Sequence, residues 1–238
     1  VAIFGGQLAI LDLVDESVEV VQVSPGFGPN DLFGYKVIET TTNDGLLLVS
    51  TAGLNFNSGY EVLVQKVDFQ GNPDLAFGDS GAAHYTSGTN IQGFADASLD
   101  VQGNLWILST QLSSGTYKGP PELIKVTPAG EVISLGTLTQ YSDAVTIGVE
   151  SYVSETGEAK TYVAYVTSSS GSATLGSDDT LTIEVARFNA DGVLDQSFGF
   201  GGKVAVGNPQ TTSFNSVVAR DLIDVASNGD IALAYVIN

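Results

Sequence analysis

Short apolar runs recur along the chain, and each follows a signal for a tight turn. Gly, Asn and Asp tolerate the positive φ that tight hairpins need, whereas Val, Ile and Tyr pack well on a pleated surface. The pattern therefore predicts antiparallel β-hairpins and no helix longer than about three turns. The clearest runs are Leu46–Val49 after Asn43–Gly45, Leu105–Leu108 after Gln102–Asn104, Tyr162–Val166 after Glu155–Gly157, and Ile231–Val236 after Asn228–Asp230.

The turn glycines recur at a regular distance. Gly45, Gly103, Gly157 and Gly229 close one class of hairpin, and Gly71, Gly130 and Gly192 close a second class between them. Successive members of each class lie about 60 residues apart, and such a period with four strands per unit is typical of a β-propeller or another repeat array. The longest interval contains the polar segment 168–180.

We therefore expect one all-β domain over residues 1–238, a β-propeller of four-stranded antiparallel blades with about four blades per chain. Residues 1–23 resemble the second hairpin alone, and residues 217–238 resemble the first hairpin alone. The two ends would then complete one blade, either within the chain or with another chain, and the pattern does not choose between these. The expected blades are 29–90, 91–141, 142–207, and 1–28 together with 208–238.

One segment resembles a known repeat family. Residues Arg187–Val204, which read RFNADGVLDQSFGFGGKV, are similar to the bacterial delta-60 repeat, which reads roughly R-F-N-x-D-G-x-L-D-x-S-F-G-x-G-G-K-V. Lys66–Ala83 matches less fully, because it keeps Gly71, Asp74, Phe77, Gly78 and Gly81 but not the other positions. The resemblance implies a propeller-like fold in large secreted or surface proteins of bacteria, and it implies no enzyme activity.

The composition narrows the classes of partner. Asp and Glu number 27 against 8 Lys and Arg, a net charge of −19, so we expect no binding to nucleic acid or to anionic membranes. No run of about 18 apolar residues exists, so we expect no membrane insertion. The chain has no Cys, which excludes disulfides and thiolate metal sites. It has no Met either, so we expect a processed or excised piece whose signal peptide has gone.

Carboxylates and amides in the delta-60-like segment suggest calcium as a cofactor. Asn189, Asp191 and Asp195 place oxygen atoms at nearly alternate positions of a loop, and Asp68 and Asp74 do so in the weaker copy. The spacing lacks the Glu that closes an EF-hand, and Asp or Asn in such loops commonly caps its own turn. Calcium binding and turn capping therefore stay as alternatives, and no other cofactor is expected.

Catalytic signatures are weak. His84 is the only histidine, and no nucleophile motif lies near it. Asp178 with Asp179, or Asp12 with Asp15 and Glu16, could form part of the carboxylate pair that a glycosidase needs, but the sequence does not supply the required distance. Trp106 lies inside an apolar run and is expected in the core.

The sequence favours a non-catalytic extracellular module of a bacterial surface protein, adhesin or surface filament, acting as a structural spacer or binding head. The alternative is a carbohydrate- or peptide-binding domain that acts through its longer loops, 52–60, 110–121 and 168–180. A polysaccharide lyase or glycosidase comes third. The expected partners are a protein or glycan at a cell surface, or another copy through hairpin exchange. The candidate anchors of the long-loop face are Tyr60, Tyr85, Tyr117 and His84.

Overall fold

The structure is a computed structural model of the whole chain. It describes residues 2–4, 7–11, 18–22, 32–55, 59–86, 91–113, 116–117, 120–139, 145–154, 156–168, 180–211, 217–218, 223–226, 228–234 and 236–237. Throughout these residues the regular structure is antiparallel β-strand. They contain no helix long and apolar enough to cross a membrane.

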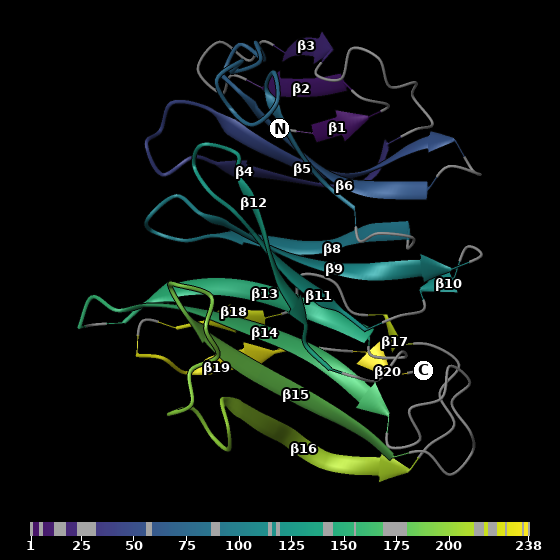
Figure 1. Cartoon of the computed structure of the whole chain (residues 1–238), viewed down its shortest axis with the longest axis vertical. Helices are drawn as coiled ribbons and strands as arrows, with labels where there is room; N and C mark the ends of the chain where they lie inside the picture. The colour runs from purple at the N-terminus through teal and green to yellow at the C-terminus, as the bar shows by residue number, and fades with distance from the viewer. Residues whose placement is uncertain are drawn as a thin grey trace.

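The strands run in short hairpin order along the chain (Figure 1). Their bounds are β1 Ala2–Phe4, β2 Gln7–Leu11, β3 Val18–Gln22, β4 Leu32–Glu39, β5 Leu46–Asn55, β6 Gly59–Val67, β7 Ala82–Tyr85, β8 Ile91–Leu99, β9 Leu105–Ser113, β10 Thr116–Tyr117, β11 Glu122–Val126, β12 Val132–Thr137, β13 Val145–Val153, β14 Ala159–Ser168, β15 Thr180–Asn189, β16 Lys203–Thr211, β17 Val217–Val218, β18 Ile223–Val225, β19 Ile231–Leu233 and β20 Val236–Ile237.

Neighbouring strands pair in chain order. The N-terminal sheet is β1-β2-β3, the first sheet is β4-β5-β6-β7, and the third sheet is β13-β14-β15-β16. The second sheet contains β8, β9, β11 and β12, with β10 folded back on β9. The C-terminal hairpin pairs β17 with β20 and β18 with β19. The first, second and third sheets correspond in order to the expected units 29–90, 91–141 and 142–207.

The predicted turns explain why the strands reverse where they do. Among the described residues, six turns share one geometry: the first residue donates its N–H to the fifth carbonyl, and the fourth residue, a glycine, donates back to the first. These glycines have φ between 80° and 87°, a left-handed conformation that strains other residues. The turns are Asp68–Asn72, Asp100–Asn104, Thr127–Glu131, Ser154–Glu158, Asn189–Val193 and Ala226–Asp230.

The turn before β5 departs from this pattern. It is one residue longer, since the Thr40 N–H donates to the Gly45 carbonyl, and its left-handed residue is Asn43, with a φ of 55°. Gly45 is needed for a different reason, because a Cβ there would lie 2.1 Å from the Val67 carbonyl oxygen. The sequence thus predicted a tight turn over Asn43–Gly45, and Asn43 is the residue that takes the left-handed conformation in it.

Two longer loops connect the last two strands of the first and third sheets, between β6 and β7 and between β15 and β16. The first motif loop is Asp74–Gly81 and the second motif loop is Asp195–Gly202. Their backbones match, since Phe77 and Phe198 donate to the carbonyls of Asp74 and Asp195. Gly78 and Gly199 have φ of 57° and 55°. Two segments that match the delta-60 pattern to different degrees therefore adopt the same conformation.

Three apolar clusters lie between successive sheets. One joins the first and second sheets and includes Phe77, Leu105 and Val126, which are at most 3% exposed. The second joins the second and third sheets and includes Trp106 and Tyr165. The third joins the third sheet to the C-terminal hairpin through Ile147 and Ile223. Trp106 is fully buried as expected, with its Nε1 donating to Asp100 Oδ2 at 2.9 Å.

The sheets stack on one another along the length of the molecule, with the N-terminal sheet at one end and β16 at the other (Figure 1). The C-terminal hairpin lies against β13. Within the described part of the chain, no ladder joins β1–β3 to β17–β20, so the described strands do not form a closed sheet. The stack is therefore all-β and antiparallel, and its ends are separate.

Candidate functional site

The first strands of the three sheets carry charged residues at equivalent positions. Lys36 on β4 pairs with Val49, Asp96 on β8 pairs with Leu108, and Glu150 on β13 pairs with Tyr162. In each ladder the charged residue stands three places before the last pair of the hairpin. Because β4 contacts β8 and β8 contacts β13, the three positions are brought to one edge of the stack.

Asp96 is the centre of this group and is almost completely buried. Its side chain is 2% exposed, and its Oδ1 lies 2.8 Å from Lys36 Nζ. The Val149 N–H on β13 donates to Asp96 Oδ2 at 2.7 Å. The residue before Val149 is a glycine, which leaves room for this bond. A Cβ on Gly148 would lie only 3.0 Å from the same Asp96 oxygen. Asp96 thus accepts bonds from the first strands on both sides of it.

Ser98 extends the same arrangement by one step along β8. Its Oγ accepts a bond from the Ser151 N–H at 2.9 Å. Residues 96 and 98 point to the same side of their strand, and residues 149 and 151 present N–H groups that β14 does not use. The two polar side chains therefore satisfy backbone donors that would otherwise be unpaired at the free edge of β13.

Glu150 has an unusual acidity. Burial is the largest cause and raises its pKa from 4.5 to about 7, with smaller raising effects from the charges of Asp96 and Asp224. The Lys36 charge and a hydrogen bond with the Ser98 side chain act in the opposite direction. Near neutral pH this carboxyl group is therefore present in both its protonated and its ionised form, while the neighbouring Asp96 is held next to a lysine.

Such a pair is chemically versatile. A carboxyl with a pKa near neutrality can donate or accept a proton during a reaction, and a second carboxylate close by can stabilise positive charge. The same groups also have a purely structural explanation, in which they hold three first strands together and satisfy backbone donors. The pairs suggested by the sequence, Asp178 with Asp179 and Asp12 with Asp15 and Glu16, lie outside the described residues.

The calcium candidates are engaged with protein donors. Lys160 Nζ donates to Asn189 Oδ1 at 2.7 Å and to Asp195 Oδ2 at 3.0 Å. Arg187 Nε donates to the same Asp195 oxygen at 2.9 Å, and the backbone and hydroxyl of Ser197 donate to the other. The Ser197 hydroxyl, with Lys160 and Arg187, lowers the pKa of Asp195 well below its usual range.

Asp191 is separate from this network, since its Oδ1 accepts a bond from the Val193 N–H and so caps its own turn. In the weaker copy, Asp68 likewise accepts from the N–H groups of Gln70 and Asn72. Within the described residues no group of three or more His, Asp or Glu side chains is arranged to hold a metal ion. The oxygens that calcium would require are thus turned toward backbone N–H groups and cationic side chains.

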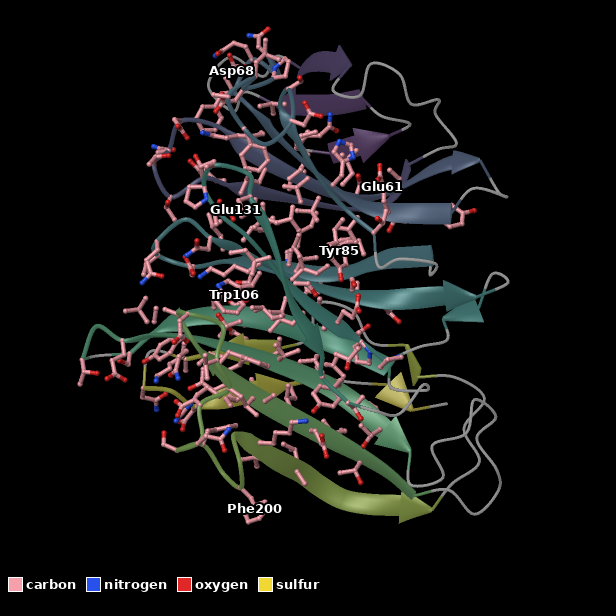
Figure 2. The ribbon with its side chains drawn as sticks, in the orientation of Figure 1. Glu61, Asp68, Tyr85, Trp106, Glu131 and Phe200 are labelled. Carbon is pink, nitrogen blue, oxygen red and sulfur yellow. The ribbon has the colours of Figure 1, made fainter. Side chains whose placement is uncertain are left out.

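The proposed anchors of the long-loop face have mixed positions. Tyr85 is not free, because its hydroxyl donates to Glu122 Oε2 at 2.9 Å and accepts from Ser134 Oγ at 3.3 Å, both in the second sheet. His84 Nδ1 lies 3.0 Å from Glu61 Oε1, and this carboxylate raises the pKa of the histidine. Tyr60 is half-buried, and the side chain of Tyr117 lies outside the described part. Figure 2 shows Tyr85 between the first and second sheets.

A small cavity of about 90 Å³ lies among the short turns of the first and second sheets. Its apolar floor comes from the interface of the first and second sheets and includes Phe77, Leu105 and Val126, whereas threonine hydroxyls and Lys66 line its mouth. Lys66 also pairs with Asp44 and Asp74, at 3.3 and 3.0 Å. The sequence analysis did not anticipate this cavity, because its walls come from turns of two different sheets.

Comparisons with known proteins give little help with function. No model of a known protein family matches the chain, and no curated protein matches it. Among solved structures, a protein of unknown function from Bacteroides caccae is similar over 98% of this chain and 90% of its own, with 9% sequence identity and a TM-score of 0.36. This likeness is too slight to carry an argument about fold or activity.

Proposed function

We propose that this chain is a non-catalytic structural module of a bacterial surface protein, built from propeller-like blades and serving as a spacer or binding head. The observation that carries the proposal is the use of its few cations. Of the 8 Lys and Arg residues in the chain, the six with described side chains all bond to protein oxygens. These bonds belong to Lys36, Lys66, Lys125, Lys160, Arg187 and Lys203.

Three of these cations tie one sheet to the next. Lys36 of the first sheet pairs with Asp96 of the second. Lys125 of the second sheet donates to the Ala190 carbonyl of the third at 2.7 Å, and Lys203 of the third donates to the Leu138 carbonyl next to the second at 2.7 Å. In a chain so poor in cations, their placement between sheets supports a role in holding the stack in one arrangement.

The propeller arrangement is supported by the order and contacts of the strands. Each of the three sheets contains four antiparallel strands paired in chain order, as propeller blades do. The first strands β4, β8, β13 and β18 contact one another in succession. Inner strands that line a common axis make such contacts. The surface location and the delta-60 family rest on the resemblance of residues 187–204 alone.

A second candidate function is favoured by one observation, the raised pKa of Glu150 at a position where the charge of Asp96 acts on it. If a polysaccharide reached this edge of the stack, Glu150 could transfer a proton next to the Asp96 carboxyl group, which Lys36 holds in place. A lyase or glycosidase uses two carboxyl groups, one of which transfers a proton to or from the sugar.

Two measurements separate these functions. The full chain is incubated with a panel of acidic and neutral polysaccharides, and new reducing or unsaturated ends are measured. We expect no turnover above buffer. Turnover that is lost in Glu150→Gln but kept in Glu158→Gln, an exposed carboxylate with the same change, would replace the structural proposal with an enzyme.

The structural role itself is measured by unfolding. Lys125→Met and Lys203→Met keep the length of each side chain but remove the bond between sheets. We expect each to lower the free energy of unfolding by about 1.5 to 3 kcal/mol, because each leaves the carbonyl of a buried or half-buried residue, Leu138 or Ala190, without its charged donor. The control is Glu158→Gln, which we expect to change it by less than about 0.5 kcal/mol. Equal stability of all three variants would contradict the structural role.

A further inference from the structure

The cavity between the first and second sheets has an apolar interior and a polar opening. Its interior is lined by core side chains such as Leu105 and Val126, which are at most 2% exposed. Exposed residues from turns of both sheets surround the opening, namely Thr41, Thr42, Gln102 and Pro128. The volume is about 90 Å³, whereas an apolar cavity of about 150 Å³ holds benzene. This cavity therefore suits a group of about four carbons, such as the side chain of leucine.

A glycine keeps the opening clear. Gly103 lines the cavity where the β8–β9 turn meets the β4–β5 turn and the end of β11. A Cβ at this position would lie 3.1 Å from Thr41 Oγ1 and 3.3 Å from Pro128 Cγ, so any larger residue would crowd the opening. The space between the two sheets is thus bounded by three turns that are already in close contact.

The charges beside the opening favour a cation. Lys66 Nζ lies 3.3 Å from Asp44 and 3.0 Å from Asp74, so one lysine faces two carboxylates and the local net charge is −1. The lysine side chain is 18% exposed, whereas the two carboxylates are 51% and 37% exposed. Hydroxyls of Thr40 and Thr42 donate to Asp44 Oδ1 at 2.6 and 2.7 Å, and they lower its pKa to about 2. The groups that an incoming molecule meets first are therefore ionised carboxylates.

Exposed apolar side chains gather on the same side of the stack. Because neighbouring strands are antiparallel, the β4–β5, β6–β7, β8–β9, β11–β12 and β15–β16 connections leave the sheets at one end of their strands (Figure 1). Leu75 and Val101 are 69% and 59% exposed, and each stands two residues from a residue that lines the cavity, Phe77 and Gly103. Among the described residues, the exposed large apolar side chains lie in or next to these connections: Phe69, Leu75, Val101, Ile133, Val193 and Phe200. A segment that crosses the opening therefore meets further apolar surface.

The same charges argue against a second copy of this chain as the occupant. The lysines and the arginine whose side chains are described all bond to protein oxygens of their own chain. A second copy would bring a net charge of −19 to an opening that is already negative. Figure 2 shows Asp68 and Glu131, carboxylates of two more turns, on this side of the stack. The complementary partner is therefore basic.

We propose that this cavity is a docking site for a basic segment of another protein. The segment places one leucine-sized side chain in the apolar interior and sets a neighbouring lysine or arginine against Asp44 and Asp74. Because the charged part of the contact is exposed, binding weakens as the salt concentration rises. The inference names a partner for the proposed binding head and rests on that function.

Three capped tripeptides with the same backbone test the proposal: Lys-Leu-Lys, Lys-Ala-Lys and Glu-Leu-Glu. Each is titrated into the ¹⁵N-labelled full chain, and the amide signals of Thr41 and Gly103 report on the opening. Signals of Gly157 and Gly229, in turns away from the cavity, report on general attraction to the negative chain. We expect Lys-Leu-Lys to shift the first two signals and to bind about ten-fold more tightly than Lys-Ala-Lys, which lacks three apolar carbons. Glu-Leu-Glu should bind several-fold more weakly, because the carboxylates repel it.

Two variants separate the charge from the cavity. Asp44→Asn keeps the shape of the side chain and should weaken Lys-Leu-Lys about two- to five-fold, whereas the control Glu158→Gln, an exposed carboxylate of the third sheet, should leave it unchanged. Leu99→Phe fills part of the interior and should remove the preference for leucine over alanine. If Leu99→Phe does not fold, the comparison of peptides on the unaltered chain still decides.

Equal affinity for Lys-Leu-Lys and Lys-Ala-Lys, or equal shifts at Gly157 and Gly103, would overturn the proposal. Tighter binding of Glu-Leu-Glu would also overturn it and would make Lys66 the recognising group. A neutral hexasaccharide that shifts Thr41 and Gly103 where Lys-Leu-Lys does not would assign the opening to a glycan. Turnover of a polysaccharide would refute the proposed non-catalytic function but would leave these shifts unchanged, so the two failures are distinguishable.

Discussion

The first and second motif loops reach the same backbone conformation by different means. The second loop, which matches the delta-60 pattern closely, is held from inside: Asp195 is 8% exposed and bonds to Lys160, Arg187 and Ser197. The first loop has lost most of that pattern, and Asp74 is 37% exposed with Lys66 as its cationic partner. It is instead held from outside by the β11–β12 turn, where the Ala129 carbonyl accepts a bond from the Gly78 N–H at 2.9 Å. A full internal network and an external cover are therefore alternative ways to fix one loop.

The largest expected effect is at the two aspartates. Asp195→Ala leaves Lys160 and Arg187 without their shared carboxylate in a nearly buried site, so we expect a loss of about 3 to 5 kcal/mol in the free energy of unfolding. Asp74→Ala removes a half-exposed partner of one lysine, and we expect a loss of about 1 kcal/mol or less. Urea unfolding of the two variants measures both. Equal losses would mean that the internal network does not distinguish the loops.

The external cover is tested at two matched glycines. Gly130 and Gly192 stand at the same place in equivalent turns, with φ of 82° and 87°, so alanine strains both backbones alike. A Cβ on Gly130 meets the Gly78 backbone, whereas a Cβ on Gly192 meets only the end of the Leu135 side chain. We expect Gly130→Ala to cost about 1 to 3 kcal/mol more than Gly192→Ala. If thermal unfolding gives the same value for both, the turn does not secure the loop.

The two sheets that carry the motif loops also differ in the charged residue of their first strand. This residue is Lys36 in the first sheet and Glu150 in the third. Because the pKa of Glu150 is about 7 in the folded chain and 4.5 ordinarily, the folded chain binds more protons between these values. Its contribution to stability is present below pH 4.5 and is lost as the pH rises through 7. Glu150→Gln, which is always neutral, should therefore be more stable than the wild type by about 2 kcal/mol at pH 8.

Denaturation curves of Glu150→Gln and wild type between pH 5 and pH 8 check this prediction. The difference between the two should shrink steadily toward the acidic end. Glu158→Gln serves as the control, since its carboxylate is exposed, and it should follow the wild type at each pH. A constant difference for Glu150→Gln across the range would show that the side chain does not titrate there.

The smallest effect is expected at Phe200. Because its ring is 95% exposed in the single chain, Phe200→Ser should change the free energy of unfolding by less than about 0.5 kcal/mol. Its counterpart position, Asp79, is polar already, so Asp79→Ser should behave in the same way. A large loss on Phe200→Ser at a protein concentration where the chain is monomeric would mean that the ring packs within its own chain.

The sequence predicted much of the local structure because local structure depends on nearby residues. Gly103, Gly157 and Gly229 take the left-handed conformation that the turns required, and strands β9, β14 and β19 contain the apolar residues that follow them. These signals lie within one hairpin, so hydrophobic alternation and turn chemistry are enough to find them.

The candidate site could not be found in the same way. Asp96 and Glu150 each stand seven residues before their turn glycines, Gly103 and Gly157, and this shared spacing was a signal that the sequence analysis did not use. What it could not supply is the contact between sheets, which joins Lys36 to Asp96 and Asp96 to Val149. Contacts between sheets also decide the surroundings of Tyr85. The sequence suggested it as an anchor of the long-loop face, and in the structure its hydroxyl is bonded to Glu122 and Ser134 of the next sheet.

The bonding of the described lysines and the arginine to protein oxygens affects how this chain behaves in solution. Within the described part of the chain each lysine and the arginine bonds to a protein oxygen, whereas carboxylates such as Asp79 and Glu131 are exposed. Such a particle behaves in solution as a polyanion that gathers mobile counterions around itself. At physiological ionic strength its field fades within about 8 Å, so approaching copies ignore each other until their surfaces almost touch, and short-range fit then decides whether they stay.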